Sequence, residues 1–441
     1  MNRVEDMTIS ESKVSLLDGI SSWKQYLSFS AVLWFMLWLG INSGPWVFND
    51  EPDNLIEWLH YIRTAFPLIV VVLAAWYYLQ RRGVEGKIIS GPVGFWLIYG
   101  LVGLIATMIS PEPFDAAYWA FSYLAVFSAL YAYIIKPDNI EGVMQLNHLN
   151  WIITTLFLLL LVFFARDTLL PVIIGKQSAY GIYGQMPVVA EMSMSRSSGM
   201  ARFAAVPGVI AFVLLWHSGG LKRILWLGLF IFSVYLIYLM QSRGAIFGFA
   251  FAMAFVMLFQ GKRSRLLGII FVSLFGLMLL SDVIPVDTIN EIKDYIYRGQ
   301  SEEDFRSMTG RTRAWENGLD AALESPLIGY GFQADRMLIH EHVHNTYLYS
   351  LITSGFVGAA FFIGGLVWAW LLFWRLIRQG KIGGNAQKIF LIQAGGILSF
   401  FTVRSIPEVC GAMFGVDFMV MLPILAYLKA ANDKLNSEES I

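Results

Sequence analysis

Charge is scarce in this sequence, because Asp, Glu, Lys and Arg together make up only 14% of its 441 residues. A soluble domain carries about 25% charged residues, so a soluble globular protein, a nucleic-acid binder and a disordered scaffold are excluded. The formal net charge is −1, and the overall charge therefore indicates no particular partner. The single cysteine, Cys410, excludes an intrachain disulfide and a metal site with several cysteine ligands.

Hydrophobic residues instead make up 57% of the chain, and its mean hydropathy is +0.60. About twelve membrane helices of ~20 residues each would account for this apolar excess. Since backbone groups in lipid must be hydrogen-bonded within a helix, we expect an all-α polytopic membrane protein that forms one membrane domain over residues 1–441. The predicted spans are 26–46, 58–79, 91–110, 114–135, 149–165, 199–217, 223–240, 244–260, 266–284, 346–374, 387–403 and 412–428.

The placement of the 31 Lys and Arg residues predicts the orientation of these spans. Loops rich in Lys and Arg stay inside, and an inside N-terminus gives every inside loop at least one of them. Both termini are therefore expected inside. The outer face then carries mostly arginine: Arg63, Arg166, Lys176, Arg196, Arg202, Arg243, Lys293, Arg298, Arg306, Arg311, Arg313, Arg336 and Arg404. Arg is a rigid fork for phosphate and carboxylate, so the set favours an outer anion site, although snorkelling or an acidic partner explains any single member equally well.

The outside segment 285–345 is the only soluble-like piece large enough to cover a site. Apolar residues at helical spacing predict a helix from Arg311 to Leu323 within it. Ser325-Pro326 is expected to end this helix, and Gly329–Gly331 to form a turn after it. We therefore expect a long, partly helical outer loop between the ninth and tenth spans.

Three of the six histidines, His340, His342 and His344, lie close together at the end of this loop. On a helix His340 and His344 would share a face, as zinc ligands can, but no carboxylate-rich motif accompanies them. A single catalytic histidine is the second interpretation, because the ordinary histidine pKa suits proton transfer near neutral pH. His344 lies where the polar loop meets the next apolar run, and would face the membrane surface. A histidine that only caps an interfacial helix is the structural alternative.

Two further charged positions lie at the rims of spans. Arg243 sits between two apolar runs with almost no loop, where an ionisable side chain is costly unless it is paired or solvated and is a functional candidate by default. Arg404 and Glu408 are four residues apart between the last two spans. An ion pair that closes this short hairpin explains them as well as a role in a site does.

Short motifs follow one another in a characteristic order around the outer loop. They are Ser242-Arg243-Gly244-Ala245, Gly310-Arg311-x-x-x-Trp315, Ser325-Pro326-Leu327-Ile328-Gly329-x-Gly331 and His344-Asn345-x-x-Leu348 with Gly355 and Gly358. Together they resemble the O-antigen ligase / Wzy-type polymerase superfamily, and the span number and loop placement agree with it. Each motif is weak alone, whereas the ordered set is specific.

The resemblance implies a metal-independent glycosyltransferase of the bacterial inner membrane, working at its periplasmic face without a cofactor. The implied donor is a glycan on undecaprenyl pyrophosphate, and the acceptor hydroxyl belongs to lipid A-core, a second lipid-linked glycan or a protein. Carried over by motif, His344 is the catalytic base of an inverting transfer, and Arg243 and Arg311 bind the donor pyrophosphate. Candidates for a supporting role are Arg196, Arg202, Arg313, His340, Asn345, Arg404 and Glu408.

Several functions remain open at this point. Within the superfamily, the twelve spans with one dominant outer loop favour a ligase with a lipid A-core acceptor over a Wzy-type repeat-unit polymerase. The end of the chain just after the last span lowers the expectation of a protein O-oligosaccharyltransferase. A membrane transporter or flippase is the rival from another class, but no internal repeat is evident and the charges gather on one face.

Overall fold

The computed structural model describes residues 29–41, 62–80, 89–134, 139–164, 197–240, 242–261, 266, 311–380 and 384–439. Arg196, Gly310, both chain ends, the loop up to residue 310 and the predicted span 266–284 beyond its first residue lie outside this described part. Within it, all regular secondary structure is helical, in agreement with the expected fold class. The helices are α2 (Phe29–Gly40), α4 (Ala65–Gln80), α5 (Gly91–Ala106), η1 (Thr107–Ile109), α6 (Pro113–Ile134), α7 (Asn139–Phe164), α9 (Ser197–His217), α10 (Gly220–Met240), α11 (Arg243–Phe259), α15 (Arg311–Glu324), α16 (Ala334–Leu338), α17 (Thr346–Gln379), α18 (Asn385–Arg404) and α19 (Val416–Glu439).

Seven helical stretches in the described part are long and apolar enough to cross a membrane. They are Gly91–Ile109, Pro113–Ile134, Ile140–Phe163, Ser198–His217, Gly220–Met240, Thr346–Gln379 and Asn385–Arg404. The shorter apolar helices α2, α4 and α11 coincide with three further predicted spans. The last predicted span coincides with α19, whose central part is apolar and buried but whose ends carry charged residues.

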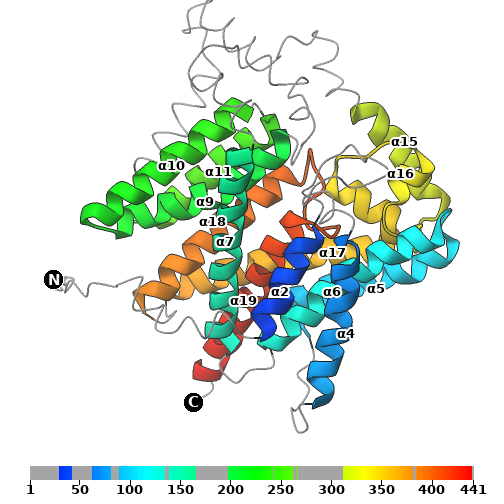
Figure 1. Ribbon diagram of the computed structural model, residues 1–441, viewed down its shortest axis with the longest axis horizontal. Helices are drawn as coiled ribbons and strands as arrows, with labels where there is room; N and C mark the ends of the chain where they lie inside the picture. Colours follow the sequence, from blue (N-terminus) through cyan, green and yellow to red (C-terminus); the bar gives the residue numbers. More distant parts are fainter. Residues whose placement is uncertain are drawn as a thin grey trace, which may run out of the picture.

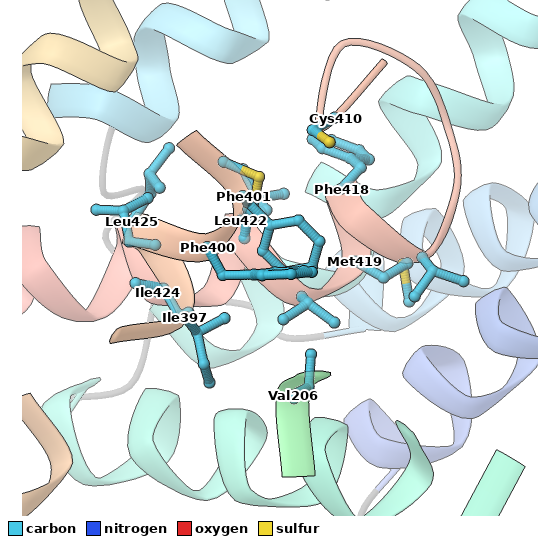
Figure 2. Packing of buried hydrophobic residues seen from close by; sticks show 14 of the residues in the cluster. Val206, Ile397, Phe400, Phe401, Cys410, Phe418, Met419, Leu422, Ile424 and Leu425 are labelled. Carbon is cyan, nitrogen blue, oxygen red and sulfur yellow. The ribbon is translucent and has the colours of Figure 1, made fainter. Parts of the chain in front are cut away.

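The helices form two groups that meet at α19 (Figure 1). In one group α9, α10, α11 and α18 pack together, and in the other α2, α4, α5, α6 and α17 do. The central α19 contacts helices of both groups, and α7 lies beside α19 and α9. The core between the groups is made by apolar side chains of α18 and α19, with Val206 of α9 beside them (Figure 2).

A buried polar contact holds the centre of the molecule together. Pro423 interrupts the hydrogen bonding of α19 because proline has no N–H to donate to the carbonyl of Met419. The side chain of Asn150, on α7, donates to that carbonyl instead. Its amide oxygen also accepts hydrogen bonds from Trp34 at 3.0 Å and Trp38 at 2.7 Å on α2. One asparagine thus supplies a backbone partner that lipid cannot offer and fastens three helices to one another.

The long helix α17 is broken near its first third. Ser354 and Gly355 leave the helical conformation, and Gly355 has a positive φ of 58°. The segment after α15 lies in the break, where Tyr330 N–H donates to Ile352 and Phe356 N–H donates to Pro326. A side chain at position 355 would overlap the backbone of Leu327. The predicted end of α15 at Ser325-Pro326 is confirmed, and the segment that follows completes the backbone hydrogen bonding of α17.

Candidate active site

The start of α17 is joined to the turn between α18 and α19 by hydrogen bonds. Asn345 caps α17 by accepting from Leu348 N–H at 2.9 Å, while its amide donates to the carbonyl of Ile406 at 3.0 Å. Thr346 donates its N–H to the carbonyl of Ser405 and its hydroxyl to the carbonyl of Glu408. These contacts fix the residue before the cap, His344, against the turn that carries Glu408.

Glu408 is the centre of the site. Its Oε2 lies 3.1 Å from Nδ1 of His344, and its Oε1 lies 3.2 Å from Nη2 of Arg311. Nη1 of Arg311 donates to the carbonyl of Pro407 at 2.7 Å. Arg311 begins α15 and His344 precedes α17, so three distant parts of the chain meet on one carboxylate.

The charges of this group favour an ionised Glu408 beside a neutral His344. Burial alone would raise the pKa of the Glu408 carboxyl, but the hydrogen bond from His344 and the charges of Arg404 and Arg311 outweigh it and hold that pKa well below its ordinary range. Burial lowers the pKa of His344, and Glu408 opposes this without cancelling it. An ionised carboxylate only accepts hydrogen bonds, so His344 carries its proton on Nδ1, and Nε2 has a free lone pair. This is the state of a histidine that can remove a proton.

Strain marks the same residue. His344 has a φ of 46°, which is uncommon for a residue other than glycine. Conformations of this kind cost about 1–3 kcal/mol and persist where the surroundings fix them. Here the cap of α17 on one side and Glu408 on the other do so. The sharp turn allows the imidazole to leave the helix end and reach the carboxylate.

Arg243 is brought to the same end of the molecule. It begins α11 and is half-buried. The next residue, Gly244, faces Pro407 closely enough that an added Cβ would lie 3.0 Å from the Cγ of that proline. The start of α11 therefore adjoins the turn from which Glu408 extends. The structure thus places the three residues that the motifs single out, Arg243, Arg311 and His344, around the 404–410 turn.

Of the two interpretations left open for Arg404 and Glu408, the ion pair that closes the hairpin is not formed: Glu408 pairs with Arg311 and His344 instead. Arg404 is 2% exposed and pairs with Asp417 of α19, Nη1 to Oδ2, at 3.0 Å. Arg202 of α9 pairs with the other oxygen of Asp417 at 3.0 Å. The chain turns at the end of α18, and the Arg404 side chain meets the acid at the start of the next helix rather than the one four residues on. The carboxylates of Glu408 and Asp417 thus pair with three arginines, Arg202, Arg311 and Arg404. These five groups together carry a net positive charge.

Other candidates are not part of this group. Arg313 and His340 are exposed. His340 and His344 do not share a helix face, because α17 begins only at Thr346 and both residues have a positive φ. No group of three or more His, Cys, Asp or Glu side chains that could hold a metal ion occurs in the described ranges.

Two acids that hold charged groups near the site, Asp417 and Asp335, are not among the residues that the sequence singled out. Asp417 could have been suspected, since an acid within an apolar run needs a partner. Asp335, a partner of His342, carries no comparable signal. Trp315, the last residue of the second motif, donates its indole N–H to the carbonyl of Val343 at 2.7 Å. That contact anchors the histidine segment to α15.

Comparison with known protein families supports the resemblance. Residues 227–363 match the family model described as O-antigen ligase, and no curated protein matches the chain. The matched region contains Arg243, Arg311 and His344, whereas Glu408 and Asp417 lie beyond it. The similarity to the O-antigen ligase / Wzy superfamily inferred from the motifs is thereby confirmed. It supports, in general terms, a membrane-embedded glycosyltransferase of the ligase or polymerase type that acts on lipid-linked glycans.

Proposed function

We propose that this chain transfers a glycan from undecaprenyl pyrophosphate to an acceptor hydroxyl of lipid A-core at the periplasmic face of the bacterial inner membrane. The observation that carries this is the contact of His344 and Arg311 with the two oxygens of Glu408. It places a proton acceptor beside an anion-binding group, which is what transfer from a pyrophosphate requires. The family match supports the general class of reaction.

His344 is the general base of this reaction. Glu408 orients its ring through Nδ1, and Nε2 takes the proton of the acceptor hydroxyl as its oxygen attacks the anomeric carbon of the donor sugar. The bond from the anomeric carbon to the pyrophosphate oxygen breaks, and the electron pair leaves with undecaprenyl pyrophosphate. Attack opposite to the leaving group inverts the configuration at that carbon.

Arg311 and Arg243 bind the leaving pyrophosphate. Two N–H groups of the Arg311 guanidinium are used by Glu408 and Pro407. Among the described residues the other three of its five donors have no partner, and we expect them to bind phosphate oxygens. Arginine forks aimed at the charge that develops on the leaving group stabilise the transition state without a metal ion. The nearby pairs of Arg404 and Arg202 with Asp417 add a positive field around the anion.

The ends of several helices gather at the site, in agreement with a periplasmic active site. Contacts between Arg404 and Ser198, between Thr346 and Ser405, and between α11 and the 404–410 turn join ends that the charge distribution assigns to the outer side. A transporter would instead need a polar cavity near the bilayer midplane. In the described part, Asn150 lies near the middle of the candidate span Ile140–Phe163, is fully buried and is hydrogen-bonded to α2 and α19.

The proposal is tested by transfer with purified protein from a defined undecaprenyl-pyrophosphate glycan. Lipid A-core and a second molecule of the donor are offered in separate reactions. A ligase forms glycosylated lipid A-core, whereas a repeat-unit polymerase, the second candidate within the superfamily, forms longer lipid-linked chains. In a deletion strain, the ligase assignment predicts loss of lipid A-linked long chains and accumulation of lipid-linked polymer. Formation of neither product in vitro contradicts the proposed function.

A further inference from the structure

His342 has a carboxylate partner of its own, separate from the one that holds His344. Its Nδ1 lies 2.6 Å from Oδ2 of Asp335, a fully buried residue in the first turn of α16. The same oxygen accepts a 3.2 Å hydrogen bond from the backbone N–H of Val343. The proposed transfer needs His344 alone as a base, and so leaves the pair of His342 and Asp335 unexplained.

The two histidine rings are direct neighbours. The centroids of His342 and His344 are 4.6 Å apart, and the ring planes meet at 71°. Between them, Val343 is fully buried, with its N–H bonded to Asp335 and its carbonyl to Trp315. The side chains of His342 and His344 are 17% and 27% exposed. The backbone is therefore fixed while both rings reach the surface of the site.

In each ring, Nδ1 contacts a carboxylate, and Nε2 is the nitrogen that can bind another molecule. Neither Nε2 atom has a hydrogen-bond partner among the described residues, and neither is one of the buried side-chain atoms that lack a partner. Both Nε2 atoms are therefore accessible, on neighbouring rings. Neighbouring hydroxyls of a sugar ring can each donate and accept a hydrogen bond, and so match this pair of nitrogens.

Asp335 does more than organise the loop. An asparagine could also accept the Val343 N–H, without bringing a charge to a position that has no exposure to solvent. Burying a carboxylate is unfavourable unless it is paired, and Oδ1 of Asp335 has no hydrogen-bond partner in the described part of the chain. The contact with the ring of His342 explains why a carboxylate rather than an amide occupies this buried position. Carboxylates orient histidines in this way where the second ring nitrogen binds a ligand or transfers a proton.

We propose that His342, held by Asp335, is a specificity-determining residue that binds the acceptor sugar through Nε2, beside the hydroxyl that His344 deprotonates. This inference rests on the proposed function and deepens it. The acceptor class is a glycan with free hydroxyls on neighbouring carbons. One hydroxyl attacks the donor, and its neighbour is held by His342.

The test compares His342→Asn with the wild-type protein. The asparagine amide can still donate to Asp335, but no atom takes the place of Nε2. Transfer is measured from an undecaprenyl-pyrophosphate glycan to a synthetic glycolipid that ends in a sugar with two neighbouring hydroxyls. We expect the acceptor KM to rise about tenfold, as for one lost hydrogen bond, with kcat nearly unchanged. With the deoxy acceptor that lacks the neighbouring hydroxyl, the two proteins should have the same KM.

His340→Asn is the matched control. His340 is exposed and has a φ of 55°, which asparagine tolerates well, so this variant should keep the wild-type acceptor KM. An unchanged acceptor KM in His342→Asn overturns the inference. So does a loss of turnover that saturating acceptor does not restore, because binding of the acceptor is then not what His342 contributes. Wild-type protein that transfers to no acceptor refutes the proposed function itself, which is a distinct result.

Discussion

The imidazole of His344 donates from Nδ1 to a carboxylate 64 residues later in the chain, Oε2 of Glu408, at 3.1 Å. The contact depends on the cap of α17, since the hydrogen bonds of Asn345 and Thr346 hold the histidine segment against the turn. The asparagine that follows the histidine in the motif thus has a structural reason. It ends the loop, starts the helix and ties both to the segment that carries Glu408.

Replacement of His344 removes the base of the proposed reaction. We expect His344→Ala to lower the rate of glycan transfer by about 10²–10⁴-fold, which is the usual contribution of a positioned base. The measurement is single-turnover transfer with purified protein, alongside size-exclusion chromatography to confirm folding. His340→Asn serves as the control and should transfer normally. Wild-type transfer by a well-folded His344→Ala protein would exclude the mechanism.

Glu408→Gln should change both the rate and its pH dependence. The proposed transfer requires the neutral His344 ring, so its rate is expected to be high above the pKa of His344 and to fall as the pH drops through that pKa. Burial lowers this pKa below the ordinary histidine value of 6.5, Glu408 raises it, and His342 and Arg311 lower it. Removal of the Glu408 charge should therefore move the acid limb of the kcat/KM profile to lower pH.

The rate of Glu408→Gln on the plateau should also fall, on the order of 10²-fold. The glutamine amide can donate to Nδ1 of His344, and this would place the ring proton on Nε2, where the base is needed. The acid limb and the plateau are read from one pH series of transfer rates between pH 5 and 8. An acid limb at the wild-type position would show that Glu408 does not act on His344.

Arg311 and Arg313 offer a matched comparison on one helix. Arg311 bonds to Glu408 and to the carbonyl of Pro407 with two nitrogens of one guanidinium, a geometry that a lysine ammonium does not reproduce. We expect Arg311→Lys to reduce kcat/KM for the donor at least about tenfold, the loss of a charged hydrogen bond. Arg313→Lys alters an exposed side chain and should have little effect. Equal effects of the two substitutions would contradict the assigned role of Arg311.

The buried acid Asp417 should matter for stability. Its two oxygens pair with Arg404 and Arg202, and removal of one partner of a buried pair costs about 3–5 kcal/mol because a charge is left unpaired. Asp417→Asn should therefore lower the midpoint of thermal unfolding in detergent clearly. Asp433→Asn breaks an exposed pair with Lys429, which contributes at most about 1 kcal/mol. A similar unfolding midpoint for both variants would mean that the ion pairs of Asp417 do not stabilise the protein.

Local rules predicted the helical parts of this molecule well, because they depend on neighbouring residues. Lipid requires helices, Pro326 stops α15 at Glu324, and the apolar runs mark most spans. The partners of the charged groups could not be predicted in the same way. A spacing of four residues would allow an ion pair between Arg404 and Glu408, but the side chain of Arg404 pairs with Asp417 on the next helix. The pairing of Asp335 with His342 depends on the path of a loop that no periodicity describes.

Two glycines of the motifs are explained by one contact that the sequence does not reveal. Gly329 and Gly355 both have a positive φ, and they face each other where the segment after α15 enters the break in α17. Gly355→Ala places a side chain in a conformation that costs about 1–3 kcal/mol and overlaps Leu327. We expect a lower unfolding midpoint and faster proteolysis between residues 325 and 345. Gly384→Ala, where nothing lies within 4 Å of the added Cβ, should leave both unchanged. If Gly355→Ala behaves like this control, the segment is not held by the break, and the position of Asp335 and the histidines must be fixed by α15 and the 404–410 turn alone.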